Sequence, residues 1–323
     1  MLKLNILSGF GGGVSGALVQ ATFGYFIGGH SSDSKTATDK LTFATGVVAV
    51  ETDIVTSNAG SNFWDISDTV TYGYHNKPAD VERLTFASDT LALNTDSDTS
   101  SSNNDHCGFS DANDTAGFGY WMGGERPADS PSLVCDRITF STSVTAVNTD
   151  SDLSVARALA SCLSDRTTFG YTIAGFSVGG TRLTSTDKTT FSTSVTAAET
   201  DSDLSSVAGQ SATGVSDNGS FGFGYYVGGV SVGNNEIVTA ERMTFSTGVF
   251  ALNTDSNLDV GKQRQRPASD NTEFGYLFCG ITDIVSVATS DRITFSSGVN
   301  AAHTDADGTT VNQSPGGMSD GAV

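Results

Sequence analysis

Short runs in which apolar and polar residues alternate recur along the whole chain, separated by turn residues. Residues 136–142 place Ile138 and Phe140 between polar neighbours, and a period of two is typical of a β-strand. Three neighbouring runs also have strand-like composition: the apolar residues 118–124, the β-branched residues 144–149 and the small residues 156–162. No segment keeps a helical period, so the pattern predicts four strands per unit in an all-β chain.

This unit occurs six times, as four sets of anchor residues show. The first anchor is the tyrosine of Phe-Gly-Tyr or its near-copy Tyr-Gly-Tyr: Tyr25, Tyr74, Tyr120, Tyr171, Tyr225 and Tyr276. The second is the phenylalanine of Thr-Phe: Phe43, Phe86, Phe140, Phe191, Phe245 and Phe295. The third is the aspartate of Thr-Asp, ten residues later: Asp53, Asp96, Asp150, Asp201, Asp255 and Asp305. A Ser-Asp pair ends each repeat, at Asp68, Asp111, Asp165, Asp217, Asp270 and Asp320.

Four-stranded units with a period near fifty residues are typical of β-propeller blades. The small-residue strand should lie innermost, where blades converge, followed outward by the Phe-Gly-Tyr, Thr-Phe and Thr-Asp strands. Glycines would let neighbouring blades approach closely, and the Phe and Tyr side chains would fill the wedge between sheets. We therefore expect a six-bladed β-propeller over residues 23–323, with four antiparallel strands per blade, preceded by a Gly-rich arm at residues 1–22.

The anchor count also predicts how the ring closes. The first Phe-Gly-Tyr has no Ser-Asp before it, whereas Ser319-Asp320 has no Phe-Gly-Tyr after it. The segment from about Thr309 to Ala322 should therefore supply the inner strand of the first blade and pair with an edge that would otherwise be exposed. The alternative is that residues 16–19 form this strand.

Charge and cysteine usage narrow the function classes. Acidic residues outnumber basic ones 36 to 16, a formal charge of −20. This argues against binding to nucleic acid or to an anionic membrane surface. We also expect no membrane insertion, because no apolar run is long enough to span a bilayer. Cys107, Cys135, Cys162 and Cys279 have no zinc-like spacing and suggest no disulfide framework, so free thiols are expected.

The acidic anchors are candidate ligands, but a structural role is expected for them. Asp150-Ser151-Asp152 and Asp305-Ala306-Asp307-Gly308 resemble calcium loops only in part, since further ligands and a distal Glu are missing. Aspartates in turns after strands usually accept hydrogen bonds from nearby backbone N–H groups. We expect this role for both the Thr-Asp and the Ser-Asp anchors. No asymmetric constellation suits catalysis, so no catalytic, metal or cofactor site is predicted and the chain is expected not to be an enzyme.

A basic residue next to an acidic one precedes every Thr-Phe: Lys40, Arg83, Arg137, Lys188, Arg242 and Arg292. A position shared by all six repeats suggests an inter-blade ion pair or a side chain that extends along apolar surface, and not a ligand clamp.

The connections differ in how much they vary. The distance from the Phe-Gly-Tyr tyrosine to the Thr-Phe phenylalanine ranges from 12 to 20 residues, whereas the turn after Thr-Phe keeps its length. The varying loops are expected to share no sequence, and include residues 30–37, 125–134, 176–184 and 230–240. Varying loops on a rigid scaffold are where recognition usually lies, although drift of unconstrained loops explains the variation equally well.

Two resemblances follow from these motifs. Leu153-Ser154-Val155-Ala156-Arg157 followed by Phe169-Gly170-Tyr171 resembles a kelch repeat, whose blades carry an Arg on the inner strand and a Gly-Gly after the second. The Gly pairs at residues 28–29, 123–124 and 228–229 match, while the later Tyr and Trp of kelch blades are replaced by the Phe of Thr-Phe. The whole repeat is also similar to Phe-Gly-Tyr/Gly-Gly repeat proteins among the virion structural proteins of tailed phages, particularly those of cyanobacteria.

These resemblances imply a virion or extracellular structural protein, such as a tail, fibre or decoration component whose loops bind a host-surface glycan. The alternatives are an extracellular propeller enzyme acting on polysaccharide and a kelch-like interaction scaffold. Residues 1–22 include Leu2, Leu4, Ile6, Leu7 and Phe10, which are more apolar than a solvated tail should be. We expect this arm to dock on a neighbouring subunit of a particle or oligomer, so that the chain is present in several copies.

Overall fold

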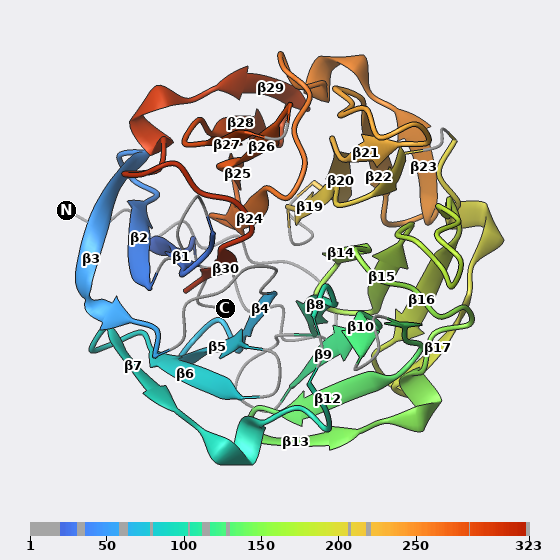
Figure 1. Ribbon diagram of the computed structural model, residues 1–323, viewed down its shortest axis with the longest axis horizontal. Coiled ribbons are helices and arrows are strands. Elements are labelled where there is room, and N and C mark those ends of the chain that lie inside the picture. Colours follow the sequence, from blue (N-terminus) through green and yellow to red (C-terminus); the bar gives the residue numbers. More distant parts are fainter. Residues whose placement is uncertain are drawn as a thin grey trace, which may run out of the picture.

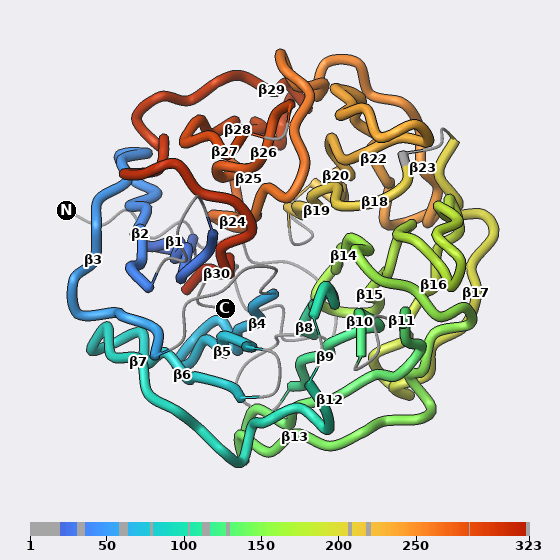
Figure 2. Tube along the Cα trace, in the orientation of Figure 1, coloured from blue at the N-terminus to red at the C-terminus, as the bar shows by residue number. Residues whose placement is uncertain are grey.

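The computed structural model describes residues 20–30, 36–57, 64–77, 80–102, 104–111, 117–126, 130–205, 208–217, 221–283 and 285–320. These residues form six four-stranded antiparallel sheets around one axis and contain no α-helix (Figure 1). The chain visits the sheets in order around the ring (Figure 2). The protein is therefore a six-bladed β-propeller, as the repeat predicts.

In blades 2 to 6 the inner strand comes first along the chain and the outer strand last, whereas the inner strand of blade 1 is the last strand of the chain. Blade 1 contains β30 (Gly316–Ser319), β1 (Phe23–Ile27), β2 (Ala37–Thr42) and β3 (Val47–Val55). Blade 2 contains β4 (Asp65–Ser67), β5 (Tyr72–Asn76), β6 (Val81–Thr85) and β7 (Thr90–Leu93). Blade 3 contains β8 (Cys107–Ser110), β9 (Phe118–Met122), β12 (Cys135–Thr139) and β13 (Val144–Val147).

The second half of the ring follows the same order. Blade 4 contains β14 (Ser161–Ser164), β15 (Phe169–Ile173), β16 (Thr186–Thr190) and β17 (Val195–Ala198). Blade 5 contains β19 (Thr213–Ser216), β20 (Phe223–Val227), β22 (Ala240–Thr244) and β23 (Val249–Leu252). Blade 6 contains β24 (Arg266–Ser269), β25 (Phe274–Phe278), β28 (Asp291–Thr294) and β29 (Val299–Ala302).

Short elements decorate this frame. Three two-stranded sheets pair β10 (Glu125–Arg126) with β11 (Ser130–Pro131), β18 (Ala208–Gln210) with β21 (Val230–Ser231), and β26 (Gly280–Thr282) with β27 (Val285–Val287). Single 3₁₀ turns follow five outer strands: η1 (Thr95–Ser97), η2 (Thr149–Ser151), η3 (Thr200–Ser202), η4 (Thr254–Ser256) and η5 (Thr304–Ala306). The Thr-Asp anchors of blades 2 to 6 thus lie in 3₁₀ turns, and the strand predicted for them ends earlier. Only in blade 1 does the outer strand continue through Thr52-Asp53.

The Phe and Tyr anchors join the blades. Each Phe-Gly-Tyr tyrosine packs against the Thr-Phe phenylalanine of the next blade, with ring centroids 5.7–6.1 Å apart; five pairs are stacked and the Tyr276–Phe43 pair is tilted by 40°. The six pairs are Tyr25–Phe86, Tyr74–Phe140, Tyr120–Phe191, Tyr171–Phe245, Tyr225–Phe295 and Tyr276–Phe43. Stacked aromatic pairs add to the stability gained from burial, so one repeated contact holds every blade boundary, including the last.

The middle glycine of each Phe-Gly-Tyr makes room for the preceding blade. A Cβ on Gly119 would overlap Ile66 of the inner strand of blade 2, and a Cβ on Gly170 would overlap Phe109 of blade 3. The glycine therefore admits a neighbouring side chain between the sheets, which refines the close approach expected from the sequence.

The ring closes with the C-terminal strand, as predicted. β30 pairs antiparallel with β1, with Tyr25 opposite Met318. One carboxylate oxygen of Asp320 accepts hydrogen bonds from the backbone N–H groups of Thr22 and Phe23, both at 2.7 Å. Residues 16–19, the alternative closing strand, lie outside the described residues, as does most of the arm at residues 1–22. Its last part is held by the propeller, because Ala21 N donates to Asp270 O.

Two sequence-based expectations are wrong. The inner strand predicted at residues 156–162 begins only at Ser161, because Leu159 has a left-handed backbone (φ 51°) and its N–H turns to Asp105 O of the preceding blade. The expectation that all four cysteines are free thiols is also wrong. Cys107 and Cys162 form a disulfide between blades 3 and 4, while Cys135 and Cys279 are free and buried. The two cysteines are 55 residues apart, and only the ring brings their Cα atoms to 5.9 Å.

Candidate functional site

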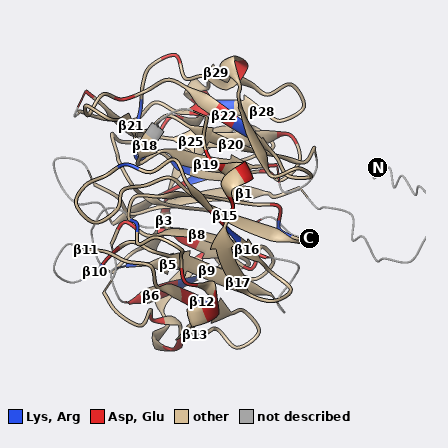
Figure 3. Cartoon of the chain, turned by 90° about the vertical axis from the view of Figure 1, so that its right-hand side faces the viewer, with Lys and Arg blue, Asp and Glu red and all other residues tan. Residues whose placement is uncertain are grey.

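The disc has two faces built from different connections. Because strands alternate in direction, the turns after the inner strands lie on one face, here called the Ser-Asp face. The connections from second to third strand and from fourth strand to the next blade lie on the other face, here called the loop face. Figure 3 shows the disc from the side, with β10, β11, β18 and β21 of the loop face at its left edge.

Every Ser-Asp anchor accepts backbone hydrogen bonds at the start of the Phe-Gly-Tyr strand it precedes in its blade, as predicted. One carboxylate oxygen of Asp165 accepts hydrogen bonds from the N–H groups of Thr167, Thr168 and Phe169 at 2.7–2.9 Å. The same three-bond arrangement occurs at Asp68 and Asp270, and fewer such bonds are described at Asp111, Asp217 and Asp320. Burial raises the pKa of Asp68 and Asp320, and the backbone hydrogen bonds oppose that shift.

The Thr-Asp anchors do not have the role expected from the sequence. All six of these aspartates are exposed on the rim of the disc. The carboxylate that accepts a backbone hydrogen bond belongs instead to the residue two positions later. Asp152 accepts from Cys135 N at 2.9 Å, and Asp203 accepts from Thr186 N at 2.9 Å. The 3₁₀ turn explains the change, because it directs the first carboxylate outward and the second toward the start of the third strand.

The basic residues before Thr-Phe follow one of the two roles expected for them, a side chain that extends along apolar surface. Each lies over the first aromatic ring of its own Phe-Gly-Tyr strand, at 4.0–5.0 Å from the centroid. Within the described residues, Lys40 forms ion pairs with Asp89 and Glu51, and Lys188 forms one with Glu199, whereas the four arginines of this set form none. The pair with Asp89 crosses between blades, whereas the pair with Glu199 stays within one blade. The shared feature is therefore a cation–π contact, and not an ion pair.

The acidic residue before each of these cations is buried. The six carboxylates are Asp39, Glu82, Asp136, Asp187, Glu241 and Asp291. Four form ion pairs with cations of the loop-face connections: Lys77–Glu82, Arg126–Asp136, Arg157–Asp187 and Lys262–Asp291. Buried charges require such partners, so these carboxylates fasten the loop-face connections to the sheets.

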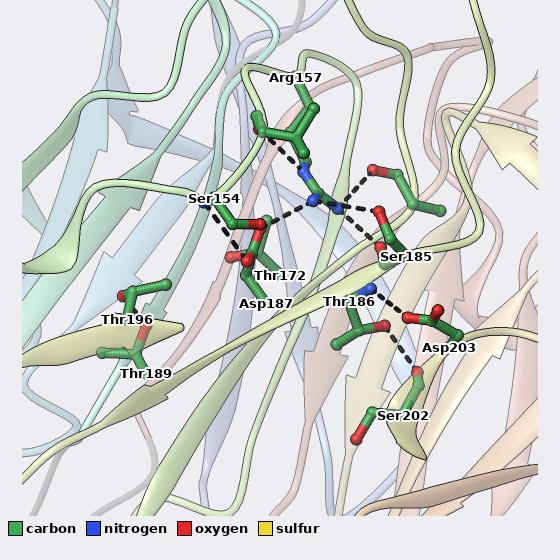
Figure 4. Close-up of polar contacts among 12 residues, drawn as sticks. Ser154, Arg157, Thr172, Ser185, Thr186, Asp187, Thr189, Thr196, Ser202 and Asp203 are labelled. Carbon is green, nitrogen blue, oxygen red and sulfur yellow. Dashed lines mark hydrogen bonds and ion pairs between the residues drawn. The ribbon is translucent and has the colours of Figure 1, made fainter. Parts of the chain in front are cut away.

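The most extensive of these networks surrounds Arg157 (Figure 4). Its guanidinium is fully buried and contacts Asp187 Oδ2 at 2.7 Å and the backbone oxygen of Ser185 at 2.7 Å. Burial lowers the pKa of Arg157, and Asp187 and Asp203 oppose that shift. Arg157 lies in the connection before the inner strand and not on that strand, in contrast to the kelch pattern it resembles. Its role is to hold the third strand of blade 4 to the preceding connection.

Two of the loops that connect second and third strands are alike. Blades 4 and 5 share Ser-Val-Gly at residues 177–179 and 231–233, so the expectation that these loops share no sequence is wrong for this pair. Ser177 N donates to Thr181 O at 2.8 Å, and Ser231 N donates to Asn235 O at 3.0 Å. Arg182 of the first loop donates to Asn234 Oδ1 of the second at 2.6 Å. The two loops therefore form one continuous surface across a blade boundary.

Apolar side chains lie at the tips of these loops. Val178, Val232 and Val285 are 64%, 68% and 60% exposed, and they occupy the second-to-third-strand connections of blades 4, 5 and 6. They are more exposed than any other large apolar residue described. All three lie on the loop face, where exposed apolar groups can contribute to a recognition surface.

The axis holds a narrow channel. It has a volume of about 130 Å³ and is lined by the six inner strands, including the serines of all six Ser-Asp anchors. Three of these hydroxyls donate to the neighbouring inner strand: Ser67 to Ser319 O, Ser164 to Ser110 O, and Ser269 to Ser216 O, at 2.9–3.0 Å. The hydroxyls of Ser216 and Ser319 accept from Ser164 N and Ser269 N of a neighbouring inner strand. Much of the channel's polar lining is thereby engaged in holding blades together.

Near the loop-face end of this channel, four backbone hydrogen bonds link five successive blades. They join five residues with a left-handed backbone, each N–H donating to the carbonyl of the preceding one: Asp105, Leu159, Ser211, Arg264 and Ser314. Asp105 and Arg264 come from opposite blades and interact electrostatically, so their side chains extend toward the axis. Burial raises the pKa of Asp105 to about 6, while Arg264 and Arg266 lower it. Its Oδ1 atom is buried without a hydrogen-bond partner among the described residues.

Other chemistry does not converge on one site. Within the described ranges no three His, Cys, Asp or Glu side chains are placed to share a metal ion. No helix in the described part of the chain could span a membrane. No family model matches the chain, and no curated protein is significantly similar to it. The fold and surface define a propeller with one uniform face and one variable face, and the candidate site is the loop surface of blades 4 to 6.

Proposed function

We propose that the protein is a non-enzymatic structural or adhesion component of a virion or extracellular surface. In this role the Ser-Asp face is turned toward neighbouring subunits, because the arm joins the disc there at Ala21, and the loop face is turned outward. The loops then bind a host-surface glycan. The observation that carries the proposal is the separation of the two kinds of connection onto opposite faces.

Further features support this assignment. The Cys107–Cys162 disulfide is of a kind that persists in oxidising surroundings, which favours a location outside the cytosol. The buried cations of the loop-face connections contact structural carboxylates, as Arg157 and Lys262 do. The exposed valines of blades 4 to 6 provide apolar contact area on the loop face.

The proposal can be tested with an array of bacterial surface polysaccharides. We expect saturable binding of the intact chain to one class of glycan. Replacing Val178 and Val232 together with serine should reduce that binding at least about tenfold without changing the thermal midpoint, because both side chains are exposed. Val195, an exposed valine of the outer strand β17, provides the control: Val195→Ser should bind like the original chain.

Two outcomes would contradict the proposal. Equal binding by the loop variant and the original chain would remove the loops from recognition. Release of new reducing ends from a bound polysaccharide would indicate a glycan-cleaving enzyme instead.

A further inference from the structure

The outer strand of every blade is a free sheet edge within the described part of the chain. Five of these strands, β7, β13, β17, β23 and β29, have four residues each and contain neither charge nor proline. Proteins usually protect exposed edges with charges, prolines, bulges or very short strands. These five edges are protected from pairing with another chain because the strands are short.

The sixth outer strand, β3, is different. It has nine residues, and Val47–Glu51 pairs residue by residue with β2 before a bulge redirects the chain. Its free edge therefore offers a regular run of backbone donors and acceptors long enough to receive another strand. It is also the one described outer strand that carries charge, at Glu51 and Asp53.

The N-terminal segment has the sequence of a matching strand. Residues 2–7 read Leu-Lys-Leu-Asn-Ile-Leu, in which Leu2, Leu4 and Ile6 alternate with Lys3 and Asn5. Lys3 is the only charged residue among residues 1–19, in a chain whose net charge is −20. The segment thus has the alternating pattern of a strand with one positive charge, and β3 is a mostly apolar strand with two negative charges.

The geometry allows the two to meet between copies. Gln20 and Ala21 are tied to Asp270 on the Ser-Asp face, so the arm leaves the disc there. The 19 residues before Gln20 can span up to about 60 Å when extended, at roughly 3.3 Å per residue. This reach is sufficient for an adjacent disc.

We propose that residues 2–7 of one copy add to the free edge of β3 on a second copy as a fifth strand. Main-chain hydrogen bonds supply the affinity, as in other strand-addition complexes. Lys3 against the exposed Asp53 fixes the partner edge, since Glu51 already pairs with Lys40 within the blade. The inference rests on the proposed docking of the arm to a neighbouring subunit, and it assigns the receiving surface.

The test uses full-length chains in a mixture. A Leu4→Cys chain with one tag is combined under mild oxidation with a Val50→Cys chain carrying another. Val50 is 49% exposed in β3, and Val147, 47% exposed in β13, gives the matched control. We expect a covalent dimer between the two tags with Val50→Cys, in at least about tenfold greater yield than with Val147→Cys, because strand addition raises the local concentration of the thiols.

Three results would overturn the inference. Equal yields at Val50 and Val147 would remove the preference for β3, and absence of a covalent dimer in both mixtures would exclude the pairing. A Leu4→Cys/Val50→Cys chain that cross-links only within itself would place the arm on its own disc.

Charge reversal checks the register by sedimentation equilibrium. Lys3→Glu should weaken self-association about two- to fivefold, and Asp53→Lys in the same chain should restore it, since exposed ion pairs contribute modestly. If Asp53→Lys fails to restore association, Lys3 does not face β3. Glycan binding by the same variants separates this inference from the proposed function: loss of association with retained glycan binding leaves recognition by the loop face intact.

Discussion

The Ser-Asp face and the loop face come from the same six repeats, but their connections are held in place by different interactions. On the Ser-Asp face one carboxylate closes each turn by accepting backbone hydrogen bonds, and Asp320 does so across the junction of the two chain ends. On the loop face the anchors vary from blade to blade. Arg157 comes from an inter-blade connection, whereas Lys77 comes from a loop within its own blade.

This difference shows how a repeat can combine a fixed frame with variable surface. A turn closed by its own aspartate needs no contact from elsewhere, so it can be copied unchanged. A loop anchored by a buried ion pair needs only an acid at a fixed position in the third strand, and the cation can come from different segments. The six buried carboxylates therefore permit variation above them without loss of the sheet below.

The largest effect is expected from breaking an anchor of the loop face. Arg157→Met should lower the free energy of unfolding by about 3–5 kcal/mol, because Asp187 would remain buried without its cation. Urea denaturation monitored by circular dichroism measures the loss. Arg126→Met is the matched comparison, since the Arg126–Asp136 pair is longer, at 3.5 Å, and partly exposed.

We expect Arg126→Met to cost clearly less than Arg157→Met. Equal and small losses in both variants would mean that the loop face is not held by its buried ion pairs, and the contrast between the two faces would then lose its basis.

The second prediction addresses the Ser-Asp face. Asp270→Ala removes the acceptor for the N–H groups of Thr272, Glu273 and Phe274, so we expect a loss of about 2–4 kcal/mol. Asp255→Ala, at an exposed Thr-Asp anchor of the preceding blade, should change stability by less than about 0.5 kcal/mol. Thermal denaturation of both variants compares them directly, and similar losses would contradict the different roles assigned to the two anchors.

Sequence reasoning recovered the frame because the frame is periodic. Strand order, the packing of Phe and Tyr side chains between blades and the closing strand all follow from the spacing of anchors that recur six times. It failed where a contact joins positions that the period does not relate. The Cys107–Cys162 disulfide depends on two neighbouring inner strands, and the Arg182–Asn234 bond joins loops of different repeats. The Ser-Val-Gly motif shared by residues 177–179 and 231–233 is the sequence feature that could have indicated that these two loops are related.

The smallest effect concerns Asp105, at the loop-face end of the axis. Its carboxylate contrasts with that of Asp68, which accepts three backbone hydrogen bonds, because Asp105 Oδ1 is buried without a partner among the described residues. Burial raises the pKa of Asp105 to about 6, against an ordinary value near 4, despite Arg264 and Arg266. The folded state therefore holds this proton more tightly than the unfolded state. Its contribution to stability falls as the pH rises from about 4 to 6 and stays low above that range.

Asp105→Asn removes this titration while keeping the shape of the side chain. The full shift corresponds to at most about 3 kcal/mol, and we expect a gain of about 1–2 kcal/mol at pH 8 after side chains relax, with little change at pH 4. Urea denaturation at both pH values measures the difference. A gain of the same size at pH 4 would show that the effect does not come from the carboxylate charge. Loss of stability at pH 8 would show that Arg264 and Arg266 depend on that charge, and Asp105 would then be an anchor of the axis like those of the Ser-Asp face.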